Sequence, residues 1–290
     1  MSRRLAVIGF IFALLVGVNH STVHAQAPPG PPIYYLSLGT SLAAGVQADP
    51  LTGEDIVTET SYPNLLADSL RETRIPKLSH VNLGCPGETS ETLIHGGKCA
   101  YPRGSQLEQA VNFLHAHRKL TALITIDVGA NDVRQCVDGV TVDTACLTEN
   151  LEQVSYNLAY ILETLQEVAP NVPIVAMNYY NPFLAYYFVD PVAAEQTIPL
   201  QMLVNLTLET IYNCYGVPVV DVAGAFMSYD LVTDENLNTI PDSLDWLCTW
   251  TWMCSHQNIH PNEAGYAMIA DLFQAMLPDL PVWAPPGRVE

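Results

Sequence analysis

The chain has 290 residues, of which 49% are hydrophobic, so it can bury a large core and is not a disordered chain. Its formal net charge of −19 at pH 7 gives an acidic surface, which repels nucleic acid and anionic membranes. We therefore expect neither of them as a partner.

The first 25 residues have the features of a secretory signal peptide. Arg3 and Arg4 precede an apolar run over residues 5–18, and Ala25 stands just before the expected cleavage point. The run is shorter than the ~20 residues of a membrane helix, so an uncleaved anchor is the less favoured alternative. The sequence thus predicts a secreted protein with a signal over 1–25, a Pro-rich linker over 26–32 and no membrane span after cleavage.

Apolar runs alternate with helical patterns along the rest of the chain. Aromatic and β-branched runs predict five strands, over residues 33–38, 78–83, 122–128, 172–178 and 217–222. Apolar residues at helical spacing predict one helix after Ser61 and others over 106–117, 148–169, 200–215 and 262–277. The polar stretch 46–60 is expected to be a loop. This alternation predicts a three-layer α/β domain with a parallel sheet over 33–278, and a tail over 279–290.

Seven cysteines lie beyond the predicted signal. In an exported chain, cysteines favour disulfides over metal binding. Six of them form pairs that are close in the sequence, Cys85 with Cys99, Cys136 with Cys146, and Cys248 with Cys254. Cys214 is left alone. Because spacing does not determine connectivity, this pairing is a hypothesis.

Polar stretches follow three of the predicted strands and precede the last predicted helix. They read GTSL at 39–42, NLG at 82–84, GAND at 129–132 and HPN at 260–262. Each stretch alone is ordinary turn or helix-start material. The carboxyl ends of parallel strands meet at one edge of a sheet, however, so these stretches are expected to converge there.

Together the four stretches supply what ester cleavage needs. The hydroxyl of Ser41 becomes a nucleophile when an imidazole such as His260 takes its proton. The main-chain amides of Ser41 and Gly84 and the side-chain amide of Asn131 are suitable donors to the oxyanion that forms. This chemistry requires no metal and no cofactor, and we expect none.

In this order, the four stretches resemble the sequence blocks of the SGNH hydrolases, also called the GDSL esterase/lipase family. The resemblance spans residues 33 to about 277. It implies a flavodoxin-like αβα fold and hydrolysis of carboxylic esters through an acyl-enzyme. It also implies that Ser41 is the nucleophile and first oxyanion donor, that Gly84 and Asn131 are the other donors, and that His260 is the general base. Secreted members of actinobacterial type often carry three local disulfides, in agreement with the pairing above.

Two positions depart from the family's pattern. The Asp that commonly precedes the serine is Thr40, and the acid that commonly stands three residues before the histidine is Gln257. His260 is then expected to be oriented by the Gln257 side chain or by a main-chain carbonyl near His256 and Gln257, as in members that use a Ser-His dyad. Asp242 and Asp245 in the preceding segment are alternatives that remain open. A metal site at His256 and His260 is disfavoured, because Pro261 and the later helix start keep them off one helix face.

An aromatic run over 179–188 follows the fourth predicted strand. Tyr179, Tyr180 and Phe183 in this run are candidates for the wall of an acyl pocket, although packing over the edge of the core is an equal alternative. Arg134, near Asn131, is a candidate to meet an anionic group, although a solvated surface role is the simpler interpretation.

The leading interpretation is a secreted, monomeric serine esterase or lipase that acts on small neutral acyl esters. One alternative is a carbohydrate acetylesterase, because the same fold serves both substrate classes. The other is a binding protein on the same scaffold that has lost turnover, which the missing acid at Gln257 favours. A reactive serine separates the last alternative from the first two.

Overall fold

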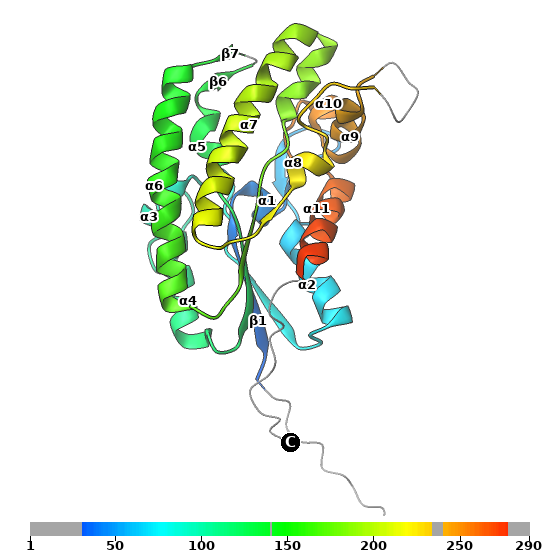
Figure 1. Ribbon diagram of the computed structural model, residues 1–290. Helices are drawn as coiled ribbons and strands as arrows, with labels where there is room; N and C mark the ends of the chain where they lie inside the picture. Colours follow the sequence, from blue (N-terminus) through cyan, green and yellow to red (C-terminus); the bar gives the residue numbers. More distant parts are fainter. Residues whose placement is uncertain (1–30, 140, 234–239, 278–290) are drawn as a thin grey trace, which may run out of the picture. The chain divides into compact units, whose positions relative to one another are not determined.

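Five parallel strands form the central sheet of the protein, whose computed structural model is drawn in Figure 1. Across the sheet, their order is β4 (Leu78–Asn82), β1 (Ile33–Gly39), β5 (Thr121–Asp127), β8 (Ile174–Met177) and β9 (Val219–Val220). The predicted α/β fold with a five-stranded parallel sheet is confirmed.

The structure describes residues 31–139, 141–233 and 240–277. The predicted signal over 1–25, most of the linker over 26–32 and the tail over 279–290 lie outside these ranges. Residues from Pro32 onward group into one unit. No helix within the described ranges is long and apolar enough to cross a membrane.

The two central strands, β1 and β5, are buried along nearly their whole length. Their sequences, IYYLSLG and TALITID, are close to continuous apolar runs, as expected for strands covered on both faces. They run parallel in a register that pairs Gly39 with Asp127 at their carboxyl ends. This pair places the residue before Thr40 directly beside a carboxylate.

Long helices form a layer on each face of the sheet (Figure 1). One layer contains α2 (Tyr62–Thr73) and α11 (Glu263–Met276), which pack on each other. The other contains α4 (Gln106–His117), α6 (Thr144–Val168) and α7 (Pro191–Cys214), in which α6 contacts both of its neighbours. Helix α7 begins before the predicted residue 200, because Asp190 caps it by accepting the Ala193 amide at 3.0 Å and Pro191 fits its first turn.

Shorter elements occupy the connections. They are the helices α1 (Ser41–Ala44), α3 (Ser90–His95), α5 (Ala130–Arg134), α8 (Val222–Ala225), α9 (Asp242–Trp250) and α10 (Met253–His256), and the 3-10 helix η1 (Pro182–Phe188). One antiparallel hairpin consists of β2 (Val46–Ala48) and β3 (Asp55–Val57). A second consists of β6 (Val137–Asp138) and β7 (Thr141–Val142). The expectation of an irregular loop over 46–60 is therefore wrong. Strands of three residues are too short to show an alternating pattern in the sequence.

Three disulfides fix the connections around the carboxyl edge of the sheet. They join Cys85 to Cys99, Cys136 to Cys146 and Cys248 to Cys254, as predicted. Cys214 is exposed and has no disulfide partner within the described chain. The last bridge ties α9 to α10, so it constrains the segment that leads to His260.

Candidate active site

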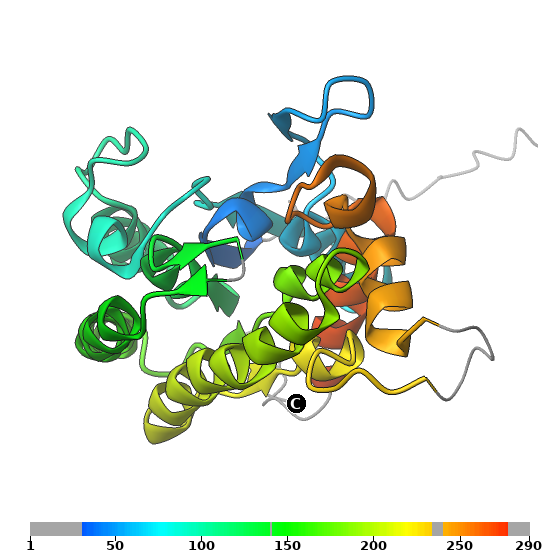
Figure 2. The ribbon, with the colours of Figure 1, turned by 90° about the horizontal axis from the view of Figure 1, so that it is seen from above.

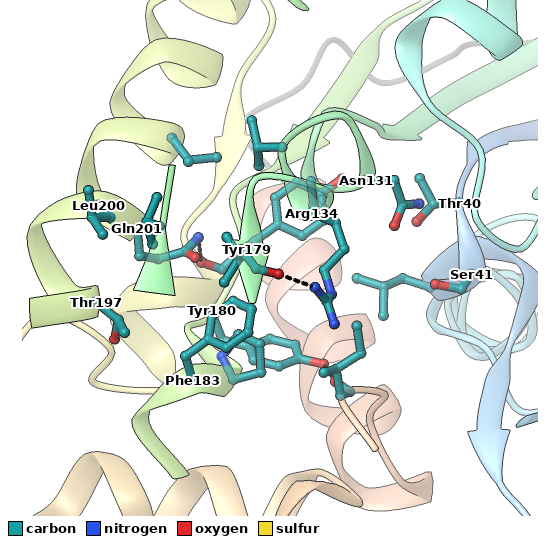
Figure 3. Close-up of a pocket in the computed structure, with 18 of the residues that line it drawn as sticks. Thr40, Ser41, Asn131, Arg134, Tyr179, Tyr180, Phe183, Thr197, Leu200 and Gln201 are labelled. Carbon is teal, nitrogen blue, oxygen red and sulfur yellow. Dashed lines mark hydrogen bonds between the residues drawn. The ribbon is translucent and has the colours of Figure 1, made fainter. Parts of the chain in front are cut away.

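A pocket opens at the carboxyl edge of the sheet (Figure 3). It contains about 970 Å³ of empty space, its open mouth included. Among the residues that line it are seven candidates singled out from the sequence, Ser41, Asn131, Arg134, Tyr179, Tyr180, Phe183 and His260. The structure thus brings the serine, the histidine, the asparagine and the aromatic run to one place.

The turn that carries Ser41 runs from the end of β1 into α1. Gly39 has φ +148°, and a Cβ at this position would lie 2.3 Å from Oδ2 of Asp127, so only glycine fits. Ser41 is the first residue of α1 and is half-buried at the pocket. Its hydroxyl therefore lies where the backbone leaves the sheet, the position expected from the sequence.

Asp127 anchors this turn from the neighbouring strand. Its Oδ1 accepts hydrogen bonds from the Thr40 amide at 2.9 Å and the Thr40 hydroxyl at 2.6 Å, and its Oδ2 accepts one from the Tyr62 hydroxyl at 2.9 Å. Asp127 is fully buried, and this burial raises its pKa to about 7 despite the donors around it. Thr40, the departure from the family's pattern, is thus the residue that connects the serine turn to a carboxylate.

The His260 ring is held through Nδ1 by two oxygens. Oδ1 of Asn258 lies 2.8 Å from Nδ1, and Oδ1 of Asp55 lies 3.2 Å from it. Asn258 also donates from Nδ2 to the same Asp55 oxygen at 2.7 Å, so the three side chains form a chain. Both neighbours of Nδ1 accept a hydrogen bond, which assigns the ring proton to Nδ1 and leaves Nε2 free as a base.

The pKa of His260 is lowered mainly by burial, while the charge of Asp55 and its hydrogen bond act in the opposite direction. The His260 residue is 8% exposed, whereas the side chain of Asp55 is 61% exposed. The imidazole is therefore neutral at neutral pH, the form in which it can accept a proton.

Gln257 and His256, which were expected to supply the group that orients His260, do not bind its ring. Gln257 is exposed, with a left-handed backbone (φ 52°) at the end of α10. The His256 ring contacts the Ser255 hydroxyl at 2.8 Å and the Pro50 carbonyl at 3.3 Å. In the hydrogen bonds of the described residues, neither the Gln257 side chain nor a main-chain carbonyl of His256 or Gln257 reaches His260, so both expectations are wrong.

Asp55 is the site residue that sequence reasoning missed. It stands in hairpin strand β3, within the stretch expected to be a loop, and 203 positions before its partner Asn258. No local pattern marks it. Asp242 and Asp245, the alternatives left open, lie in the first turn of α9.

The expected oxyanion donors Asn131 and Gly84 differ in whether an amide hydrogen is still available to bind a substrate. Asn131 donates from Nδ2 to the Glu88 carbonyl at 2.9 Å, which leaves its second amide hydrogen in the pocket it lines. The Gly84 amide instead donates to Oδ1 of Asn82 at 2.9 Å, and a Cβ at Gly84 would lie 2.6 Å from the backbone nitrogen of Ala44. Gly84 therefore allows close packing on α1, and its amide hydrogen is already occupied.

A glycine three residues later is better suited to donate. Within the described residues, the amide of Gly87 makes no hydrogen bond. It immediately precedes Glu88, whose carbonyl binds Asn131. The Gly87 amide is thus a donor that the structure leaves unused beside a residue of the pocket.

The pattern of the GDSL-like lipase/acylhydrolase family matches residues 37–268. No curated protein sequence matches the chain.

Several solved structures have a similar fold. A variant of an acetyl-xylooligosaccharide esterase from Geobacillus Stearmophilus has a TM-score of 0.53 at 17% identity, over 89% of this chain and 99% of its own. A lipase from a goat rumen metagenome has a TM-score of 0.52 at 18% identity, over 84% and 96%. An extracellular lipase from Streptomyces rimosus has a TM-score of 0.50 at 17% identity, over 82% and 98%. At these identities the likeness is one of fold.

Proposed function

Because the chain belongs to the GDSL-like lipase/acylhydrolase family and is therefore a carboxylic ester hydrolase, we propose that Ser41 is its nucleophile and His260 its general base. One observation supports this assignment above the others. The two residues, more than two hundred positions apart in the sequence, line the same pocket. The free Nε2 of a neutral imidazole is the group that the reaction requires there.

The reaction begins when Ser41 Oγ attacks the carbonyl carbon of the ester and its proton passes to Nε2 of His260. The C–O bond forms as the carbonyl electron pair moves to oxygen, and this oxyanion accepts hydrogen bonds from the Ser41 amide and the Asn131 side chain. We assign the third donor to Gly87 in place of Gly84, because the Gly87 amide is unoccupied. The intermediate expels the alcohol, which takes the proton from His260. Water then repeats the cycle on the acyl-enzyme and releases the acid.

The substrate is an ester with an acyl group longer than acetate. The pocket is lined mostly by apolar side chains, and Tyr179, Tyr180 and Phe183 give it an aromatic wall suited to an acyl chain. The hydroxyl of Tyr180 donates to the Ile259 carbonyl, so this wall is fastened to the residue before His260. These features favour an esterase or lipase over a carbohydrate acetylesterase. Three disulfides, together with the signal features, support secretion.

A fluorophosphonate probe tests the assignment of the nucleophile. The purified mature chain is incubated with the probe, digested and mapped by mass spectrometry. We expect one labelled peptide, with the label on Ser41, because only a serine activated by a base reacts at a useful rate. A protein that binds without turnover takes up no label, and label on another serine would contradict the proposal.

We further propose that Asp55 completes the site as the acid that stabilises protonated His260. Asp55→Asn is expected to lower kcat by about 10- to 100-fold. This loss is smaller than for a fully buried triad acid, because Asp55 is largely exposed and Asn258 still holds the ring. Since the Asp55 charge raises the pKa of His260, its removal should also move the acidic limb of the pH–rate profile to lower pH.

The matched control for this experiment is Gln257→Ala, at the position where the family commonly has its acid. It should change kcat by less than about twofold, since the Gln257 side chain is exposed and makes no hydrogen bond with His260 in the described structure. Steady-state rates on p-nitrophenyl butyrate across a pH series measure both variants. A larger loss in Gln257→Ala than in Asp55→Asn would show that Asp55 does not have this role.

A further inference from the structure

A single permanent charge lies in the wall of the pocket. Arg134 stands one helical turn after Asn131 on α5 and lines the same cavity. Among the described residues of this lining, no other arginine, lysine, aspartate or glutamate occurs. In Figure 3 the Arg134 side chain extends into the pocket, in the region between Ser41 and Tyr180.

The guanidinium of Arg134 is held in place by neutral groups. Its Nη1 donates to the Val137 carbonyl at 2.8 Å, and its Cζ lies 5.8 Å from the centroid of the Phe183 ring. A cation over an aromatic face is attracted to it, so the ring and the carbonyl together restrict the side chain. A guanidinium has five N–H donors, and most of them are left for another partner.

No carboxylate of the described structure pairs with Arg134. This is unexpected in a chain with 30 acidic and 11 basic residues, where an acidic partner would be easy to supply. Arg134 is exposed to solvent where it lines the pocket, and its contacts with the Val137 carbonyl and the Phe183 ring hold its charge beside apolar lining residues. An anion that enters the pocket can pair with it through charge-assisted hydrogen bonds. The geometry is that of a receptor for a carboxylate or phosphate.

On the basis of the function proposed above, we propose that Arg134 selects esters that carry an anionic group, a carboxylate or a phosphate, near the reacting carbonyl. The anion would accept two parallel hydrogen bonds from the guanidinium, while the ester lies at Ser41 and the apolar part of the substrate lies against the aromatic wall. The charge of the whole chain opposes such a substrate, so a preference for it requires a local cation.

Matched pairs of esters test this inference. The first arm compares p-nitrophenyl half-esters of succinic, glutaric and adipic acid with p-nitrophenyl butyrate, valerate and hexanoate, which have equal numbers of acyl carbons. The second arm compares an acylglycerol phosphate with the monoacylglycerol of the same chain length. The measured quantity is the ratio of kcat/KM for the anionic ester to that for its neutral partner, after subtraction of the uncatalysed rate.

The wild-type ratio is expected to exceed one in at least one arm, and the arm shows whether the acyl or the alcohol part carries the anion. Arg134→Gln should lower that ratio by about 3- to 10-fold, a modest effect because Arg134 is exposed. Arg134→Lys should restore part of it, because lysine keeps the charge but cannot donate two parallel hydrogen bonds. The control is Arg103→Gln, which removes the same charge at an exposed position that does not line the pocket. Its ratio should stay within about twofold of the wild type.

Two outcomes overturn the inference. If wild type cleaves neutral esters and Arg134→Gln leaves both ratios unchanged, Arg134 merely fastens the β6–β7 hairpin through Val137. If wild type shows no preference for either anionic ester, Arg134 is not a selector. Wild type that cleaves no ester of either kind would instead contradict the proposed function.

Discussion

Replacing Ser41 by alanine is expected to lower the hydrolysis of p-nitrophenyl butyrate by about 10⁴-fold or more. The variant keeps the pocket and the oxyanion donors, but it has no oxygen that can form the acyl-enzyme. The residual rate comes from water that enters the same pocket and is activated by His260. Steady-state kinetics with active-site titration measures the loss.

The fold should survive this change. The Ser41 side chain is half-buried, and its hydroxyl makes no hydrogen bond within the described residues, so the thermal midpoint should move by only a few degrees. Ser255→Ala, at an exposed serine beside His256, is the matched control and should retain the wild-type rate. A Ser41→Ala protein with more than about a tenth of the wild-type rate would rule out Ser41 as the nucleophile.

Replacing Asp127 by alanine is expected to lower the free energy of unfolding by about 2–5 kcal/mol and to reduce kcat as well. The change removes the acceptor for the Thr40 amide, the Thr40 hydroxyl and the Tyr62 hydroxyl, and it leaves these donors buried. The turn that places Ser41 then loses its anchor. Urea unfolding and kcat, measured on the same preparations, test the two effects.

Asp127→Asn is the matched variant. Its amide oxygen still accepts from Thr40, and its NH₂ group can donate to the oxygen of Tyr62, so it should be much more stable than Asp127→Ala. If the alanine and asparagine variants are equally stable and active, Asp127 does not anchor the serine turn.

A comparison of wild type with Asp127→Asn also tests how stability depends on pH. Burial raises the pKa of Asp127 to about 7, whereas an unfolded Asp titrates near about 4. Between these values the folded protein keeps a proton that the unfolded chain has released, so the stability due to this group is present below about pH 4 and is lost as pH rises through about 7. Wild type should therefore lose more stability than Asp127→Asn between about pH 5 and about pH 8.

The sequence predicted correctly the features that are formed by residues close together in the chain. The buried strands β1 and β5 are long apolar runs, and the turns that follow them contain Ser41 and Asn131. The disulfides were predictable because each joins cysteines in the same connection, at separations of 14, 10 and 6 residues. In these cases the residues that make up the sequence pattern are the same residues that form the strand, the turn or the disulfide.

The sequence failed where a role depends on contacts between distant segments. Asp55 approaches His260 only because a short hairpin packs against the segment around α10 (Figure 2), and strands of three residues leave no periodic signal. Gly84 was chosen by its place after a strand, but whether its amide is free depends on the rotamer of Asn82. The start of α7 is different, since the Asp190-Pro191 pair is a readable helix start that the internal Pro199 obscured.

The hairpin that carries Asp55 has one buried strand, β2, and one exposed strand, β3. Its strands pair only with each other, β3 is exposed at all three positions, and the five-stranded sheet is complete without it. The carboxylate that raises the pKa of the histidine is therefore carried by the exposed strand of this hairpin, whereas burial lowers that pKa. An engineer who wants this catalyst to work in more acidic or more alkaline media can confine the library to the exposed residues 54–57 and leave the buried strand β2 alone.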